Sequence, residues 1–135
     1  MSAAGLWVMA AVMATATVSG SMPGGLNPVS VNDAGVVNAS LAAAEAYNRG
    51  SNDMYSSRVS RVVEAQTQVV AGILYHLKVE LKTTTCRKLQ GASTQSASCP
   101  FHQTAKKRLC EFKVWERVWV GPPKVTVGTC TLVTE

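Results

Sequence analysis

The chain of 135 residues is most economically one domain, and nothing in its composition suggests a second. Aromatic residues make up only 6% of the chain, so we expect the core to depend on aliphatic side chains and covalent cross-links. The first 20 residues contain no charged side chain, so the formal net charge of +5 belongs entirely to the remainder.

The first 20 residues are predicted to be a secretory signal peptide. Their apolar run from Leu6 to Val18 is too short to span a bilayer as a stable helix. The sequence Val18-Ser19-Gly20 fits the small-residue rule for cleavage before Ser21, which leaves residues 21–135 as a secreted, extracellular domain. No Lys or Arg stands near the start of the chain, so an uncleaved anchor is the alternative.

An extended arm and a helix are predicted next. Residues Ser21 to Ser30 contain two prolines and two glycines without periodicity, which predicts a mobile N-terminal arm. A helix then runs from a cap at Asn32 or Asp33 to about Arg49, with Gly50 suited to its C-terminal stop. We expect it to lie across a sheet through an apolar stripe of Val36, Val37, Leu41, Ala44 and Tyr47.

Two long strands are predicted around an exposed tip. The small polar residues from Ser51 to Tyr55 indicate a turn, and the β-branched residues from Arg58 to Thr67 indicate the first strand. The apolar tip Gln68 to Gly72 follows, where glycine supplies the backbone freedom of a tight turn. Ile73 to Thr83 alternates with a period of two. This second strand should bury Ile73, Tyr75, Leu77, Val79 and Leu81 and expose His76, Lys78, Glu80 and Lys82.

Two more strands are predicted near the C-terminus, from Leu109 to Trp119 and from Val125 to Leu132. Trp119 falls where the chain turns toward Gly121-Pro122-Pro123, and an exposed tryptophan suits an interface anchor. The alternation of the first of these strands predicts an inward face of Phe112, Val114 and Val118.

The four cysteines of a secreted chain indicate two disulfides, for which three pairings are open. Zinc binding is the alternative. The sequence has no C-x-x-C pair, and His76 and His102 stand at no recognisable ligand spacing, so neither a metal nor another cofactor is expected.

Basic residues gather in the second half of the chain, at Arg87-Lys88 and Lys106-Lys107-Arg108. They are consistent with an acidic partner such as heparin-like glycans or an anionic membrane, although a solvated loop and strand edge is the simpler interpretation. Nucleic-acid binding is not expected, because these residues are not interleaved with stacking aromatic side chains.

The pattern Q-x-V-x-G at Gln68, Val70 and Gly72 resembles the central hairpin of the type 2 cystatins, secreted inhibitors of papain-like cysteine proteases. The resemblance covers about Pro23 to Cys130. The other matching features follow in the family's order: Gly24, Ser51-Asn52-Asp53-Met54-Tyr55, four cysteines and Trp119.

The resemblance implies an α+β fold in which a long helix packs across a curved antiparallel sheet of four to five strands. It also implies sequential disulfides, Cys86 with Cys99 and Cys110 with Cys130. Cystatins carrying Ser-Asn-Asp after the helix inhibit legumain, an asparagine-cleaving cysteine protease, so the resemblance implies a second site at Asn52. Related cystatins exchange the helix and first strand between two molecules, so a domain-swapped dimer is the alternative to a monomer.

The implied activity is reversible, tight-binding inhibition of cathepsins and other papain-like proteases, with the arm and two hairpin loops filling the active-site cleft. Two positions depart from the family: Met22-Pro23 replaces larger aliphatic residues, and Val118 stands where proline is common, so the fixed φ of proline is missing. The residues that the resemblance assigns to protease binding are Gly24, Gln68, Val69, Val70, Ala71, Gly72, Val118 and Trp119.

Two other classes of function are the alternatives to protease inhibition. An enzyme is not expected, because every cysteine is assigned to a bridge and the sequence shows no Ser/His/Asp or carboxylate constellation. A cystatin-fold protein with a non-inhibitory role in immune signalling or at membranes is the stronger rival, because the departures at Pro23 and Val118 touch two of the three contact segments.

Overall fold

The computed structural model describes residues 24–88 and 98–133. The predicted signal peptide, the Met22-Pro23 departure and most of the loop between Cys86 and Cys99 lie outside the described residues. No helix in the described ranges is long and apolar enough to cross a membrane.

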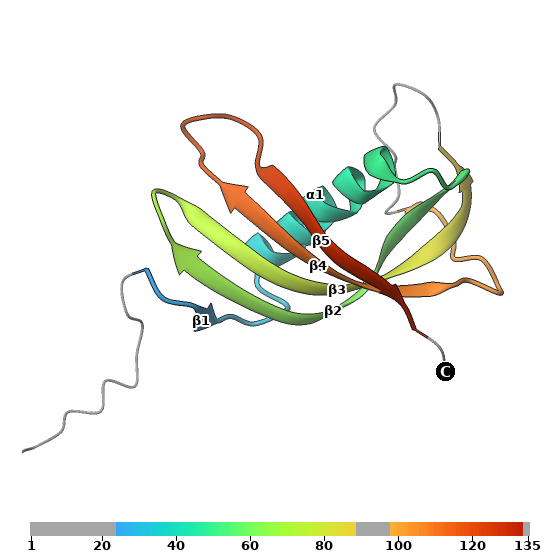
Figure 1. Ribbon diagram of the computed structural model, residues 1–135, viewed down its shortest axis with the longest axis horizontal. Coiled ribbons are helices and arrows are strands. Elements are labelled where there is room, and N and C mark those ends of the chain that lie inside the picture. The colour runs from blue at the N-terminus through green and yellow to red at the C-terminus, as the bar shows by residue number, and fades with distance from the viewer. Residues whose placement is uncertain (1–23, 89–97, 134–135) are drawn as a thin grey trace, which may run out of the picture.

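One helix lies across one face of a curved antiparallel sheet, as Figure 1 shows. This arrangement confirms the α+β fold that the sequence implies. The five strands neighbour one another in chain order, β1 to β5. The elements are β1 (Asn27–Pro28), α1 (Ala34–Gly50), β2 (Tyr55–Val69), β3 (Ile73–Arg87), β4 (Lys107–Glu116) and β5 (Lys124–Leu132).

The helix forms where it was expected, and Val36, Ala44 and Tyr47 of the predicted stripe face the core. Asp33 is its N-cap residue, and its carbonyl accepts the first helical bond from Val37 at 2.9 Å. Val37 and Leu41 of the predicted stripe are 43% and 42% exposed. Small side chains let the helix approach the sheet closely, so it turns an alanine-rich face inward. The buried residues are Val36, Ala39, Ser40, Ala43, Ala44 and Asn48.

The core lies between this helix face and the centre of the sheet. Tyr75, Leu77, Val79 and Leu81 of β3 are buried as predicted, beside Phe112 and Val114 of β4. Two residues of β3 differ from the prediction, however. Ile73 is 42% exposed because it begins the strand at the hairpin tip, and Glu80 is 9% exposed although it faces away from the helix.

Glu80 is buried within a polar cluster on the outer face of the sheet. Its carboxylate accepts a hydrogen bond from Ser60 Oγ at 2.7 Å and pairs with Arg61 Nε at 3.3 Å. The pairing of β2 with β3 shifts register between Val59 and Arg61, which brings both partners to one carboxylate. The Ser60 bond, with help from Arg61, holds the pKa of Glu80 below its usual value.

The predicted mobile arm is partly a strand. Asn27 and Pro28 pair with Thr67 and Gln66 at the edge of β2, and the Val29 amide donates to the Ala65 carbonyl at 3.1 Å. The mobile-arm prediction is therefore wrong for this stretch. An edge strand offers backbone groups to any extended neighbour, and it tolerates proline.

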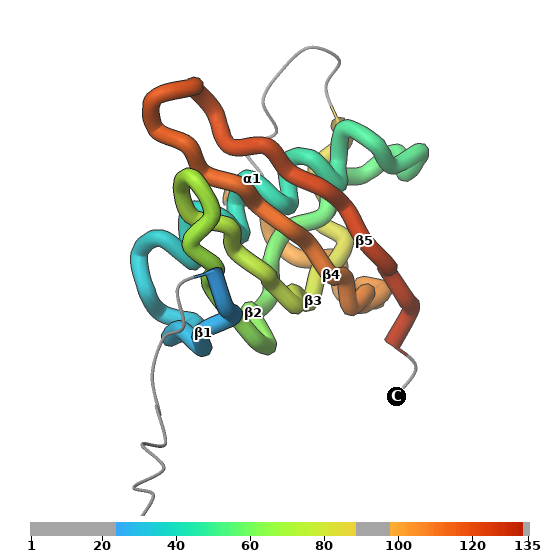
Figure 2. Tube along the Cα trace, turned by 60° about the vertical axis from the view of Figure 1, so that its left-hand side comes forward, coloured from blue at the N-terminus to red at the C-terminus, as the bar shows by residue number. Residues whose placement is uncertain are grey.

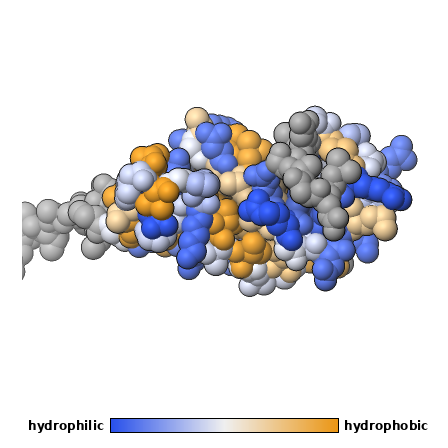
Figure 3. Space-filling view, turned by 90° about the horizontal axis from the view of Figure 1, so that it is seen from above, coloured by the Kyte–Doolittle hydropathy of each residue, from blue (hydrophilic) through white to orange (hydrophobic). Residues whose placement is uncertain are grey.

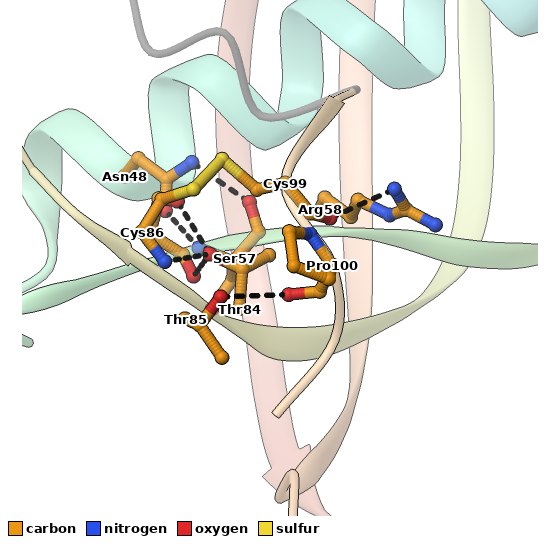
Figure 4. The surroundings of a disulfide bond; sticks show 9 residues. Asn48, Ser57, Arg58, Thr84, Thr85, Cys86, Cys99 and Pro100 are labelled. Carbon is orange, nitrogen blue, oxygen red and sulfur yellow. Dashed lines mark hydrogen bonds between the residues drawn. A yellow bond between two sulfur atoms is a disulfide. The ribbon is translucent and has the colours of Figure 1, made fainter. Parts of the chain in front are cut away.

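Two disulfides reinforce the C-terminal part of the sheet. Cys86 is bonded to Cys99, and Cys110 to Cys130, which is the sequential pairing implied by the resemblance. Loops of this size contribute roughly 3 kcal/mol each in the chain-entropy model. Figure 4 shows the first bridge beside Asn48, whose side-chain amide both donates to and accepts from the backbone of Ser57, at 2.9 and 2.8 Å. This contact ties the end of α1 to the start of β2.

Candidate functional site

Three segments meet at one end of the molecule. Figures 1 and 2 both show the β2–β3 turn and the β4–β5 turn at the same end of the sheet, with the start of the described chain beside them. These are the three segments that the sequence singles out for protease contact. The structure therefore brings together residues that are up to about a hundred positions apart in the chain.

The first turn reverses the chain within three residues. The Val70 amide donates to the Gly72 carbonyl at 3.1 Å, and both Ala71 (φ 36°) and Gly72 (φ 113°) have positive φ. Glycine adopts this backbone conformation readily, whereas alanine does so at a cost of about 1–2 kcal/mol. Val69, at the end of β2, is 65% exposed.

The second turn presents three apolar side chains to solvent. Val118, Trp119 and Val120 are 80%, 65% and 56% exposed, and the Val120 amide closes the turn by donating to the Arg117 carbonyl at 3.0 Å. The prediction that Val118 faces inward is wrong. Strand β4 ends at Glu116, so the alternation of the strand no longer applies in the turn.

The two turns are packed against each other. A Cβ atom placed on Gly72 would lie 2.5 Å from the Glu116 carbonyl oxygen and 3.4 Å from Cη2 of Trp119. The indole Nε1 of Trp115 donates to the Val70 carbonyl at 3.3 Å, and the Arg117 guanidinium stacks 3.8 Å from the same indole. Gly72 is therefore required for close approach as well as for its backbone conformation.

Trp115 and Arg117 were missed as site residues. Alternation placed Trp115 on the outer face of a strand, and nothing in the sequence indicates that its ring reaches the carbonyl of a neighbouring turn.

Gly24 of the arm is joined to the first hairpin through Gln68. Its side-chain Nε2 donates to the Gly24 carbonyl at 2.7 Å, so its Oε1 is left to accept from His76 Nε2 at 3.1 Å. Burial, followed by the nearby Lys113 ammonium, lowers the pKa of His76. Gln68 therefore positions the arm, a role that the sequence did not indicate.

These segments bring exposed apolar side chains to one end of the molecule, which we call the apolar edge. Hydrophobic side chains are visible at this end of the molecule, beside the grey trace, in Figure 3. Exposed apolar groups gathered in this way mark interaction surfaces. The exposed members of the apolar edge are Leu26, Val69, Ile73, Val118, Trp119 and Val120.

Asn52 lies apart from the apolar edge, beyond the opposite end of β2. The fifteen residues of β2 extend up to ~50 Å along the strand. Asn52 is exposed, and its neighbours are fixed: Lys88 Nζ donates to the Ser51 carbonyl at 2.9 Å, and Arg108 pairs with Asp53 at 3.3 Å. The loop therefore presents an asparagine on a braced backbone.

Comparisons with known proteins agree with this geometry. The family model described as a cystatin domain matches residues 24–119. Cystatin-2 of Crotalus adamanteus is 43% identical over 111 residues, which cover 80% of this chain and 79% of that protein. Cystatin-C of Rattus norvegicus is 38% identical over 133 residues, 93% of each chain. Among solved structures, that of dimeric human cystatin F has a TM-score of 0.75 at 30% identity and covers 87% of this chain and 94% of that one.

Proposed function

The chain belongs to the cystatin family, and from this we propose that it is a reversible, tight-binding inhibitor of papain-like cysteine proteases such as cathepsins. Cystatins are protease inhibitors, so the chain is not an enzyme. The observation that carries the proposal is the apolar edge, in which the arm and both turns are already joined by direct contacts.

The proposed mechanism is steric. A papain-like protease holds its reactive thiolate at the bottom of a cleft. The apolar edge is a wedge that fills this cleft by burying Val69, Trp119 and their exposed neighbours. No peptide bond is offered to the thiolate, so the inhibitor is not consumed. Because the turns are preassembled, binding loses little conformational entropy beyond ordering the arm.

The substitution of Val118 for proline is compatible with this mechanism. Proline would fix the backbone through its ring. Here the turn is held by the Val120 to Arg117 hydrogen bond and by the contact of Glu116 and Trp119 with Gly72. Val118 itself is 80% exposed, so it adds apolar area to the surface that enters the cleft.

We further propose that the chain is secreted after removal of residues 1–20. Two disulfides in a small domain fit an oxidising compartment. The secreted form is a monomer that converts to a domain-swapped dimer when the 70–72 turn opens, and the positive φ of Ala71 favours that opening.

A second inhibitory site for legumain is proposed at Asn52. An asparagine-cleaving protease requires an accessible asparagine on an extended, substrate-like loop. The loop from Ser51 to Met54 meets this requirement: Asn52 is exposed, and Lys88 binds the loop on both sides, at the Ser51 carbonyl through Nζ (2.9 Å) and at the Met54 carbonyl through its backbone amide (3.0 Å). Such bracing limits the movement that cleavage needs.

Titration of active-site-quantified papain with the oxidised mature chain tests the main proposal. Inhibition should reach completion at one inhibitor per protease, and the inhibitor should remain intact on a gel. The variant Trp119→Ala should weaken inhibition, whereas Leu41→Ala, which removes an equally apolar exposed side chain on α1, should leave it unchanged. Full papain activity in excess inhibitor would favour the non-inhibitory cystatin-fold alternative.

A further inference from the structure

One row of side chains on the outer face of the sheet differs in charge from the rows beside it. The register places Arg58 of β2 opposite Lys82 of β3, and Lys82 opposite Lys107 of β4. Leu81 points into the core, so Lys82 and its cross-strand neighbours lie on the face away from α1. Neighbouring strands lie about 4.8 Å apart, so this cationic row crosses roughly 10 Å of the sheet.

The two neighbouring rows on this face combine positive and negative side chains. Lys78 stands between Glu64 and Glu111 and contacts Glu64 at 3.9 Å. In the row between, Arg61 pairs with Glu80. The row of Arg58, Lys82 and Lys107 is different, because all three side chains are cationic. Like charges directly opposite one another on a sheet are destabilising, so this row lowers the stability of the sheet.

Among the described residues, Glu80 is an acid in the neighbouring row, and its carboxylate is bound within that row. Its two carboxylate oxygens are bound by Ser60 and Arg61. The positive charge of Lys107 contributes to its lowered pKa, but less than these two partners do. The closest partners of Glu80 are therefore Ser60 and Arg61 rather than the cations of the row.

Two of the three cations are held in place by one aromatic ring. The Arg58 guanidinium lies 4.0 Å and the Lys82 ammonium 5.4 Å from the centre of the Phe101 ring. Arg58 Nη1 also donates to the Cys99 carbonyl at 2.8 Å, and Figure 4 shows Arg58 beside the disulfide-linked segment. An arriving anion would therefore meet cations whose positions are already fixed.

We propose that the cationic row, extended by the adjacent exposed Lys106, binds a sulfated polysaccharide. A linear chain with fixed anionic groups matches a row of cations in both charge and shape. Single-stranded nucleic acid requires open aromatic surfaces for base stacking, whereas Phe101 is occupied by Arg58 and Lys82. The disulfides also favour an oxidising compartment, where sulfated polysaccharides are common polyanions.

This surface is separate from the apolar edge. Lys82 follows Ile73 by nine residues along β3, which is about 30 Å of strand. The proposal therefore does not depend on protease inhibition, and a polysaccharide and a protease could be bound together.

The test is calorimetric titration of the oxidised mature chain with heparin at about 0.15 M salt, where long-range attraction is screened. The triple variant Arg58→Gln/Lys82→Gln/Lys107→Gln should bind about tenfold more weakly, because individually weak ionic contacts at the surface add across the row. The control Lys78→Gln/Lys113→Gln/Lys124→Gln removes the same charge elsewhere on the sheet, and its affinity should fall less than about threefold.

Each of four other outcomes would overturn the proposal. These are equal losses in both triple variants, undetectable binding of the unmodified chain, equal affinity for unsulfated hyaluronan, and complete displacement of heparin by anionic phospholipid vesicles. Thermal unfolding of each variant checks that it is folded. If the triple variant does not fold, Lys82→Gln alone is compared with Lys113→Gln, and an equal effect of the two overturns the proposal.

Discussion

The side-chain amide of Gln68 donates a hydrogen bond of 2.7 Å to the backbone carbonyl of Gly24, across 44 positions of sequence. The bond joins the end of β2 to the first residue of the described chain. Since Gln68 is supported in turn by His76, the position of Gly24 is set by side chains of β2 and β3.

Loss of the hydrogen bond from Gln68 to Gly24 should loosen the arm without disturbing the two turns. Deleting the residues through Gly24 should weaken papain inhibition mainly through faster dissociation. Gln68→Ala should raise the dissociation rate about threefold to tenfold, which corresponds to one hydrogen bond. Gln66→Ala, two residues earlier on the same strand face, is the control. In the truncated protein Gln68→Ala should have no further effect, and a full additional effect there would show that Gln68 does not act through the arm.

Gly72→Ala should separate the two turns. The new methyl group would lie 2.5 Å from the Glu116 carbonyl, and alanine would be strained at φ 113° by about 1–3 kcal/mol. Inhibition should weaken at least about tenfold, measured as the inhibition constant for papain. Gly50→Ala introduces the same group where nothing lies within 4 Å, so its inhibition constant should not change.

Ala71→Gly should slow domain swapping. The strain in the hairpin lies at Ala71, which has φ 36°. Glycine removes that strain from the monomer, so the monomer should gain about 1 kcal/mol relative to a dimer with an extended hairpin. Size-exclusion chromatography after mild heating at high concentration should show less dimer than Ala105→Gly shows. Dimer that still inhibits papain fully would contradict this route.

Asn52→Ala should abolish inhibition of legumain and leave inhibition of papain unchanged. The exposed Asn32, before the helix, provides the matched control Asn32→Ala. Because β2 separates Asn52 from the apolar edge, the unmodified chain should form a ternary complex with both proteases on a sizing column. Mutually exclusive binding would mean that the two sites overlap.

His76 should make stability depend on pH. Its pKa is lowered in the folded chain, so the unfolded chain binds more protons near the ordinary pKa of about 6.5. Stability should therefore fall as pH decreases through that value. His76→Gln should flatten the decrease in the thermal midpoint between about pH 7.5 and 5.5. Lys78→Gln, on the same strand face, serves as the control, and an unchanged slope in His76→Gln would exclude this contribution.

The sequence predicts most of the fold because its strands alternate over long stretches. Alternate residues of β3 and β4 are buried as that pattern requires: Tyr75, Leu77, Val79, Leu81, Phe112 and Val114. The pattern fails where periodicity ends: Val118 lies beyond the end of β4, and Asn27 with Pro28 pairs only because the edge of β2 is available.

The helix face and the internal contacts of the site depend on packing. A stripe through Val37 and Leu41 has the correct helical spacing, but the sheet accepts the smaller alanine face instead. The contacts of Trp115 with Val70 and of Gln68 with Gly24 join distant segments, and no local pattern specifies them.

The positions of the disulfides divide the molecule into two parts. All four cysteines lie between residues 86 and 130, so β3, β4 and β5 are covalently reinforced, whereas β1, α1 and β2 contain no cysteine and are held by packing, hydrogen bonds, ion pairs and the 70–72 turn. We expect these parts to open as units of unequal stability, with the part that lacks disulfides the weaker unit. The apolar edge crosses their boundary, with Gly24 and Val69 on the weaker unit and Trp119 on the stronger. A transient opening of the weaker unit therefore dismantles the arm and half of the hairpin while the tryptophan turn stays folded.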